Sequence, residues 1–524
     1  MKRLGIILVF VFSILVNVYF GFQKSGFHED EYYTYYSTNR SIGLYQPDRQ
    51  WQDRQTILDE FVVKPGEGFN YGLVKLVQSW DVHPPLYYMI FHTICSFATG
   101  VFTKWPGIIT NLIAFSLTFL VLDLILRRLR ASYFVEVMAL LFYGVNPQTI
   151  SCNMLIRMYA WLSLFVALCA YLHIRMVQEY DEKKAKEGFG RFFLTMFLPI
   201  MITSYLGFLT QYFYLFFFVS IGVAFAAWLV FVRKDIRLGA IYVISCAVSL
   251  ALAVFTYPAS VHHMLGGYRG NEAAGSIFDI GNTVMRLSFF AGLLNDFVFA
   301  GVLWVLGIVI LVGLGYKLYL KKANGLAPEF VIFAVGVIGY FLITAKAALL
   351  VGSASNRYEM PAYGLVIVIV AVLLQRALRL DTSASKGVQL AGKIMMLAAG
   401  AVLLFKGIVV DDRVLFMYPE DKDKIAYAAE NHDQVAVVMY NPATPHNVWR
   451  LTDELLEYDK VFYMDEENTE PITEDNLINA GKIILYVADD ESQDEALDNL
   501  KKSTGKEQME LQSFEDMWVT YELK

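Results

Sequence analysis

The sequence predicts an all-α membrane protein with many spans, followed by a small α/β domain. Of its 524 residues 56% are hydrophobic, more than the interior of a soluble fold of this size can hold. Apolar stretches of spanning length recur through residues 1–410, whereas 411–524 contain 28 Asp and Glu against 10 Lys and Arg. We therefore expect a transmembrane helical module over 1–410 and a separate acidic domain over 411–524.

The apolar segments number twelve and lie at about 4–22, 85–102, 105–126, 132–149, 156–178, 192–210, 212–232, 238–257, 298–319, 328–348, 360–380 and 388–410. Assigning the sides of the membrane requires that one of the two segments after residue 84 does not span. Segment 85–102 follows Pro84-Pro85 and contains His92, so we expect it to be short or re-entrant. About eleven true spans would then place the C-terminus outside.

Basic residues decide the orientation, because short cytoplasmic loops are enriched in Lys and Arg. The clusters assigned to the cytoplasm are Lys2-Arg3, Arg127 to Arg130, Arg175 to Arg191, Arg233 to Arg237, Lys321-Lys322, and Arg376 with Arg379. The loops 23–84, 150–157, 258–286 and 349–359 and the acidic domain then lie outside. The sequence thus predicts a multi-pass protein of the cell (plasma) membrane with an extracytoplasmic working face.

The loop 23–84 is long and rich in Tyr, Trp and charge, which favours a structured element. Amphipathic spacing near 54–61 and 71–78 predicts short helices on the membrane surface.

The acidic domain alternates helices with strands expected at 435–440, 461–464, 482–487 and 518–523. This pattern predicts a small, mostly parallel α/β fold. It has no Gly-rich phosphate loop, and its net charge of −18 argues against nucleic acid and anionic membrane as partners.

Acids and tyrosines follow the first apolar segment directly, in the stretch HEDEYYTYY over residues 28–36. Carboxylates at this position can act as a general base or as ligands of a hard divalent metal. A solvated loop with a favourable helix N-terminal charge fits the same pattern. At the other end of the loop, Asp81-Val82-His83-Pro84-Pro85 can hold His83 rigidly, although prolines also simply begin helices.

Cations on the predicted outer side run against the bias of membrane proteins and therefore indicate an anionic partner. They are Arg157, which precedes Tyr159, Arg357, which precedes Tyr358, and Lys346. The guanidinium fork suits two phosphate oxygens, although interfacial snorkelling explains an arginine at this depth equally well.

The turn Thr210-Gln211-Tyr212 adds polar groups of low specificity. His262-His263 fits a solvated loop better than a metal site, and the four cysteines lack paired spacing and read as packing residues.

The ordered set of motifs resembles a known family. Asp30-Glu31, His83 to Leu86, Arg157 to Ala160, Thr210 to Tyr212 and Arg357 to Pro361 occur here in the order seen in GT-C fold glycosyltransferases that use polyprenyl-phosphate sugars. Within that family the set is most similar to bacterial relatives of protein O-mannosyltransferases and of the aminoarabinose lipid A transferase. The resemblance covers about residues 1–380.

The resemblance implies an active site at the outer membrane face and transfer of a sugar from a polyprenyl phosphate to a glycan, lipid or protein acceptor. It implies that Asp30 is the base with Glu31 beside it, and that Arg157 and Arg357 hold the lipid phosphate. Tyr159, Lys346 and Tyr358 are further expected substrate contacts, and His83 fits an orienting role. Gln211 replaces the family's histidine and cannot transfer a proton, so Gln211 and Tyr212 are expected to form hydrogen bonds only.

The mechanism expected is a single inverting displacement, with an isoprenoid groove in the apolar body and with the tyrosines near Asp30 contacting the sugar or packing the loop. A divalent metal at Asp30 and Glu31 is left open, and no other cofactor is expected. A transporter or flippase for an anionic polyprenyl lipid would use the same cations without a base, but the sequence lacks the internal repeats of such proteins. A membrane-anchored binding protein would not need so many spans.

Overall fold

The computed structural model describes residues 3–40, 46–319, 325–378, 380, 385–489, 494–514 and 517–524. The chain forms two compact units. Unit 1 comprises Met1–Phe22, Gln78–Ile90 and Gly107–Leu415, and unit 2 comprises Gln23–Val77, Phe91–Pro106 and Phe416–Lys524. The first predicted loop and the predicted acidic domain therefore fold largely into one unit.

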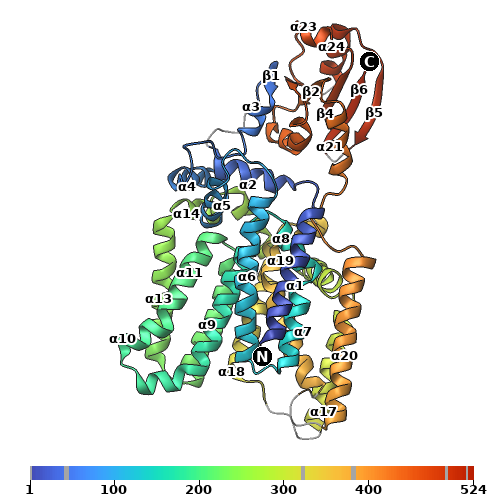
Figure 1. Ribbon diagram of the computed structural model, residues 1–524. Coiled ribbons are helices and arrows are strands. Elements are labelled where there is room, and N and C mark those ends of the chain that lie inside the picture. The colour runs from blue at the N-terminus through green and yellow to red at the C-terminus, as the bar shows by residue number, and fades with distance from the viewer. Residues whose placement is uncertain are drawn as a thin grey trace. The chain divides into compact units, whose positions relative to one another are not determined.

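Unit 1 is helical (Figure 1). Its elements are α1 (Leu4–Gln23), α6 (Trp105–Arg128), α7 (Tyr133–Gly144), α8 (Pro147–Met154), α9 (Tyr159–Lys186), α10 (Phe189–Phe192), η1 (Phe193–Phe197), α11 (Leu198–Thr210), α12 (Tyr214–Ala227), η2 (Trp228–Val232), α13 (Ile236–Thr256), α14 (Ala259–Leu265), α15 (Tyr268–Phe278), η3 (Ile280–Asn282), α16 (Thr283–Leu293), η4 (Leu294–Val298), α17 (Leu303–Tyr319), α18 (Pro328–Ala347), η5 (Gly352–Ser355), α19 (Asn356–Ala377), α20 (Lys386–Phe405) and η6 (Lys406–Val410).

Among the described residues, nine helices are long and apolar enough to cross a membrane, and a pair bent by 74°, Tyr268–Phe278 with Ile280–Val298, would make ten. The chain is thus a multi-pass membrane protein, with fewer long helices than the eleven spans expected from the sequence. Two of the predicted spans contain shorter helices, α7 with 12 residues and α17 with 17. The bent pair reaches into segment 258–286, which we had expected to be a loop.

Segment 85–102 contains only α5 (Leu86–Ser96), whose 11 residues are too few to span a bilayer. This agrees with the expected short piece. His92 accepts a hydrogen bond from Asn70 N at 3.0 Å through Nε2, and its Nδ1 lies 3.1 Å from Asn39 Oδ1. A polar side chain therefore connects α5 to the first loop.

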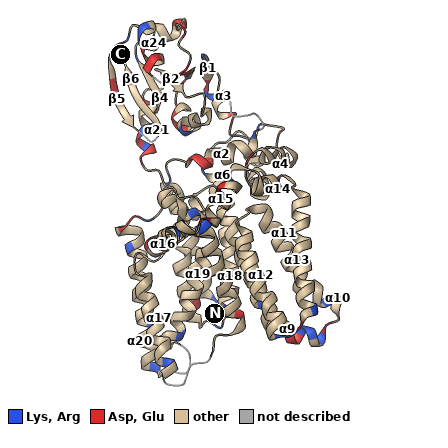
Figure 2. Ribbon diagram, turned by 180° about the vertical axis from the view of Figure 1, so that it is seen from behind, with Lys and Arg blue, Asp and Glu red and all other residues tan. Residues whose placement is uncertain are grey.

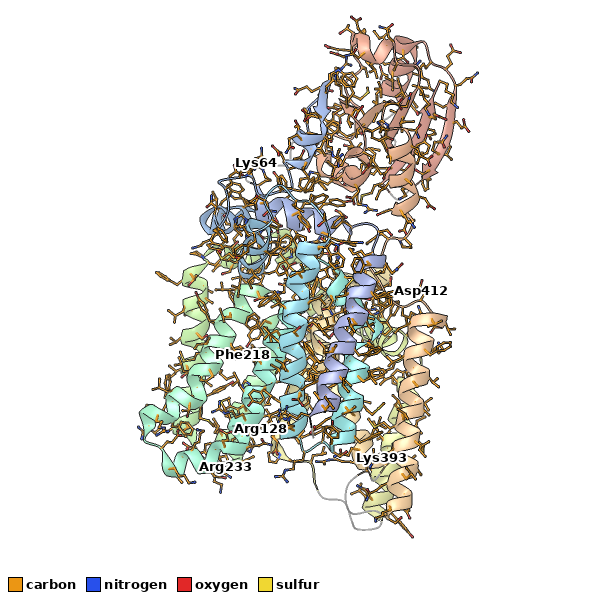
Figure 3. The ribbon with its side chains drawn as sticks, in the orientation of Figure 1. Lys64, Arg128, Phe218, Arg233, Lys393 and Asp412 are labelled. Carbon is orange, nitrogen blue, oxygen red and sulfur yellow. The ribbon has the colours of Figure 1, made fainter. Side chains whose placement is uncertain are left out.

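Many Lys and Arg residues lie at the end of the unit 1 helices that carries the labels α9, α10, α17 and α20 (Figure 2). Figure 3 shows Arg128 and Arg233 at that end and Phe218 farther along the bundle. The clustering matches the pattern from which orientation was predicted, although the sidedness itself stays a prediction. Lys2, Lys321, Lys322 and Arg379 belong to the predicted cytoplasmic clusters but lie outside the described residues.

Small residues let the unit 1 helices approach closely. A Cβ at Gly336 of α18 would lie 2.8 Å from Ile221 Cβ of α12, and one at Gly207 of α11 would meet the Tyr214 ring at 2.5 Å. Tight packing of this kind is the main source of helix association in a bilayer, where burying apolar surface from water no longer drives it.

Unit 2 joins the first loop to a six-stranded sheet. Its elements are α2 (Glu29–Asn39), β1 (Gln50–Asp53), α3 (Arg54–Leu58), part of α4 (Tyr71–Trp80) and of α5, α21 (Asp421–Glu430), β2 (Val435–Tyr440), η7 (Pro445–Leu451), α22 (Thr452–Leu455), β3 (Lys460–Asp465), α23 (Asp475–Ile478), β4 (Ile483–Ala488), α24 (Asp494–Thr504), β5 (Met509–Phe514) and β6 (Trp518–Leu523).

The strand order is β1-β3-β2-β4-β6-β5. β2 pairs in parallel with β3 and β4, whereas the β1–β3, β4–β6 and β5–β6 pairs are antiparallel. The expected mostly parallel sheet is therefore mixed, because these three pairs are antiparallel. β1 comes from the first loop, and β5 was not predicted as a strand. Alternate residues of β2 enter different cores, Val438 on one face and Val437 on the other, as the period of a strand requires.

Candidate active site

A chain of three polar side chains lies in unit 1 at the end of the first loop. His83 Nδ1 is 2.9 Å from Asp81 Oδ2, and His83 Nε2 is 3.2 Å from Arg157 Nη2. Tyr257 OH donates to the His83 carbonyl at 3.3 Å. His83 therefore holds Arg157 in place and is itself held from three directions, an arrangement that fits an orienting role.

Asp81 is the carboxyl member of this group of hydrogen-bonded side chains. Burial alone would raise the pKa of its carboxyl, but the charge and hydrogen bond of His83, together with the charge of Arg157, lower the pKa overall. The sequence analysis noted Asp81 only as a neighbour of His83. The structure shows that the Asp81 carboxyl holds His83, which in turn contacts Arg157.

The motifs that were predicted to lie outside the membrane converge around Tyr358. Its ring centroid lies 6.1 Å from that of Tyr159 and 5.5 Å from that of Phe213, and its carbonyl accepts a hydrogen bond of 2.7 Å from Tyr340. Tyr159 belongs to the Arg157 motif, and Phe213 follows the Gln211-Tyr212 turn. Segments predicted separately from the sequence therefore meet within one unit.

The turn at Gln211 is held by local hydrogen bonds. Gln211 Oε1 accepts from Tyr212 N at 2.6 Å, and Tyr212 OH lies 2.9 Å from His263 Nδ1. His263 Nε2 lies 3.3 Å from the Ser79 carbonyl. His263, expected to be solvated, is instead buried and connects this turn to the segment that carries Asp81 and His83.

The two arginines of the motifs are both buried, with Arg157 4% and Arg357 8% exposed. The Arg357 guanidinium lies over the Tyr358 ring at 5.2 Å, and its Nη2 donates to Tyr358 OH at 3.4 Å. Glu359 on the same turn of α19 is fully buried, and neither of its carboxylate oxygens has a hydrogen-bond partner among the described residues. The sequence analysis did not single out Glu359.

Lys346 occupies the end of α18. Its Nζ donates to the Asp279 carbonyl at 2.6 Å, to Thr283 Oγ1 at 3.1 Å and to Asn282 Oδ1. These acceptors carry no formal charge, so the positive charge of Lys346 is solvated by dipoles. Arg286 was not predicted as a site residue. It is buried, lies three residues after Thr283, and donates from Nε to the Ala345 carbonyl at 2.9 Å.

Asp30 lies in unit 2, in the first turn of α2. His28 is the N-cap, and its Nδ1 accepts from Asp30 N at 3.0 Å, while the Asp30 carboxylate is 3.6 Å from the same nitrogen. The Asp30 side chain is 27% exposed. An acid at this position benefits from the helix dipole and remains accessible to a substrate.

Glu31 lies in a different environment from Asp30. Its side chain is fully buried and forms an ion pair of 3.0 Å with Lys24, which also donates to the Phe416 carbonyl at 2.7 Å. The same carboxylate oxygen accepts from His28 N at 2.5 Å, completing a capping box. Burial lowers the pKa of the Lys24 amine, and the charge of Glu31 opposes that effect.

Most tyrosines of α2 pack the loop. Tyr32, Tyr35 and Tyr36 are buried, and the Tyr36 ring lies 4.4 Å from that of Trp449. Of the two roles considered for these side chains, the structure supports loop packing. Tyr33 is only half-buried, with its ring 5.5 Å from that of His446.

The described residues contain no group of three or more His, Cys, Asp and Glu side chains arranged to hold a metal ion. Glu31, one of the two acids considered as ligands, already faces the Lys24 ammonium.

Comparison with solved structures is informative about the fold. ArnT from Cupriavidus metallidurans, solved with undecaprenyl phosphate bound, aligns with a TM-score of 0.52 over 100% of this chain and 98% of ArnT, at 11% identity. The apo oligosaccharyltransferase of Archaeoglobus fulgidus aligns with a TM-score of 0.50 over 94% of this chain and 70% of that one, at 12% identity.

The chain has the GT-C fold. This confirms the fold that the ordered motifs predicted. No protein-family model matches the sequence, and no curated protein matches it either. The roles of individual residues in this GT-C protein therefore depend on the geometry described above.

Unit 2 contains two carboxyls that should make its stability depend on pH. Burial raises the pKa of Asp453 and of Glu60 to about 7, although hydrogen bonds from Tyr32 and Trp449 oppose the shift. Both pKa values lie above those of unfolded chains, so the stabilisation is complete below pH 4 and is lost as the pH rises through 7. Glu60→Gln keeps an acceptor for Trp449 Nε1 and removes the ionisation.

Between pH 5 and pH 8 the unfolding free energy of the wild type should fall by roughly 1–3 kcal/mol more than that of Glu60→Gln. Thermal unfolding in detergent at several pH values, followed at unit 2, measures this difference. Glu510→Gln, at an exposed acid of β5, is the control. Parallel pH curves for the wild type and Glu60→Gln would show that Glu60 ionises normally.

Proposed function

We propose that the chain is a glycosyltransferase that moves a sugar from a polyprenyl-phosphate donor to an acceptor on the extracytoplasmic face of the membrane. The observation that carries this proposal is the convergence of the Arg157, Gln211-Tyr212 and Arg357 motifs in unit 1 of a GT-C fold. ArnT, which shares that fold, was solved with undecaprenyl phosphate. The acceptor is a hydroxyl or amine of a glycan, lipid or protein.

The reaction we propose is a single displacement with inversion at the anomeric carbon. The acceptor oxygen or nitrogen bonds to that carbon, its proton passes to the Asp30 carboxylate, and the bond between the carbon and the donor phosphate oxygen breaks. The electron pair leaves with the phosphate, whose growing charge Arg157 and Arg357 stabilise. Glu31 is buried and paired, so we assign it a positioning role beside Asp30.

The charge and burial of these side chains support the proposed roles of Asp30 as base and of the two arginines as phosphate ligands. Asp30 is acidic and partly exposed, whereas Arg157 and Arg357 are cationic and buried, which strengthens their interaction with an anion. His83 and Asp81 hold Arg157 in a fixed orientation. Lys346, surrounded by neutral acceptors, is a further cation that we propose acts on the anionic donor.

An apolar cavity of about 220 Å³ in unit 1 supports the lipid nature of the donor. It lies between α7, α17, α19 and α20, and its lining includes Phe142, Leu306, Ala371 and Leu403. The apolar segment Lys386–Val410, which contains α20, is mostly exposed, so we propose that lipid chains of the membrane reach the cavity there. We propose that part of the isoprenoid chain occupies it.

The Asp30→Asn variant should lose activity by at least about a hundred-fold, because amide nitrogen and oxygen cannot take the acceptor proton. The assay follows release of polyprenyl phosphate from lipid-linked sugars of a native membrane extract, by mass spectrometry. Donor should co-purify with the variant and so identify its sugar. Glu29→Gln is the matched control and should remain active. Full turnover by Asp30→Asn, or movement of the lipid across vesicles without sugar transfer, would reject the proposal.

Replacing Arg157 or Arg357 by Lys should weaken binding of undecaprenyl phosphate by roughly ten-fold or more, because an ammonium cannot form the paired hydrogen bonds of a guanidinium. Binding is measured by native mass spectrometry in detergent. Arg376→Lys, on the other end of α19, serves as the control and should bind normally. Equal affinity for all three variants would remove the phosphate role from Arg157 and Arg357.

Filling the apolar cavity should affect long donors selectively. Ala399→Trp places an indole among the lining residues, so KM should rise for a full-length polyprenyl donor but not for an analogue with two isoprene units. Leu397→Trp lies on an exposed face of the same helix and is the control. An equal change for both donors would show that the cavity does not take the isoprenoid.

A further inference from the structure

The sequence of helix α2 is not enough to keep the helix stable by itself. It has 11 residues, of which four are Tyr and two are Thr, and isolated helices of this length and composition are marginal in water. Yet eight of its residues are buried. Since Asp30 lies in its first turn, the direction of the Asp30 carboxylate depends on whatever holds α2 in place.

Residues of the C-terminal part of the chain hold the start of α2. Arg450 Nη1 donates to the Phe27 carbonyl, directly before the N-cap, and the Arg450 guanidinium also lies 3.8 Å from the Asp421 carboxylate. Ser25 N donates to the Met417 carbonyl at 2.9 Å. The backbone entering α2 is therefore paired to residues 392 and 423 positions later in the sequence.

Further contacts fix the rest of the helix. Tyr32 OH donates to Asp453 Oδ2 at 3.3 Å, and the rings of Tyr33 and Tyr36 lie 5.1 and 4.4 Å from that of Trp449. Contacts at successive turns restrict both the axis of α2 and its rotation. A shift of either would move Asp30 at the first turn.

Gly26 shows how closely the two segments approach. A Cβ built at this position would collide with the carboxylate of Asp421, so any larger residue must displace the Asp421 side chain, α21 or the entry to α2. The Asp421 carboxylate is in turn held by Lys424 at 3.1 Å. The approach is therefore fixed by a side chain that has little freedom to move away.

We propose that Arg450 and Asp453 of the C-terminal α/β domain are positioning residues for Asp30, and that the domain contributes to sugar transfer by fixing helix α2. The inference depends on the proposed function only for the role of Asp30. It gives a catalytic purpose to a domain that has no Gly-rich phosphate loop and whose hydrophobic cores also take in Ile57 and Trp51 of the first loop.

The test combines kinetics with amide hydrogen exchange over residues 29–39 of the full chain in detergent. Arg450→Gln should raise exchange in this segment and lower kcat by at least about ten-fold, because small misplacements of a catalytic group are costly. The donor KM should stay within about two-fold, because Arg157 and Arg357 are untouched. Arg450→Lys keeps a donor for the Phe27 carbonyl and should recover part of kcat.

Two further variants complete the design. Gly26→Ala retains every charge but disturbs the approach of Asp421, and should reproduce the effects of Arg450→Gln. Lys482→Gln breaks an ion pair of 2.5 Å with Glu522 in the same domain, away from α2, and should change neither kcat nor exchange over residues 29–39.

Unchanged exchange at α2 in Arg450→Gln and Gly26→Ala, or raised exchange with normal kcat, would overturn the inference. The exchange result alone does not depend on the base assignment, because exchange is measured without turnover. An active Asp30→Asn variant would instead overturn the proposed function.

Discussion

The buried ion pair between Lys24 and Glu31 is the interaction on which the surroundings of Asp30 in unit 2 depend. Both side chains are fully buried, so neither charge can be solvated by water, and removing either partner would leave the other uncompensated. Glu31 also caps α2, and Lys24 also binds the Phe416 carbonyl. One charge pair thus joins the end of the first membrane helix, the helix carrying Asp30 and the start of the C-terminal segment.

In unit 1 a series of hydrogen bonds holds a buried charge, that of Arg157. A cation that is desolvated and held still before it meets an anion binds that anion with little further ordering. Asp81 and His83 orient Arg157, and aromatic contacts among Tyr159, Phe213 and Tyr358 bring the neighbouring motif segments together. The cost of burying these cations is offset by partners within the same unit.

Much of the fold could be predicted because its signals are local. Long apolar runs identified α1, α9 and α18, and the β2 strand was predicted with the bounds it has. The bent helix pair near residue 279 and strand β1 were missed, because a bend and an edge strand depend on packing partners. The mixed sheet follows from the same cause, since only pairing decides strand direction.

The sequence by itself determined the membrane character and the GT-C type of fold, because apolar runs and short ordered motifs are readable along the chain. It also predicted roles for Asp30, Arg157 and Arg357, which stay predictions. Only the tertiary structure separated Asp30, partly exposed, from Glu31, buried against Lys24. Only it placed Arg450 and Asp453 against α2, because those contacts join residues more than 400 positions apart. Burial and long-range pairing decide the roles of like side chains, and neither leaves a local pattern in one sequence.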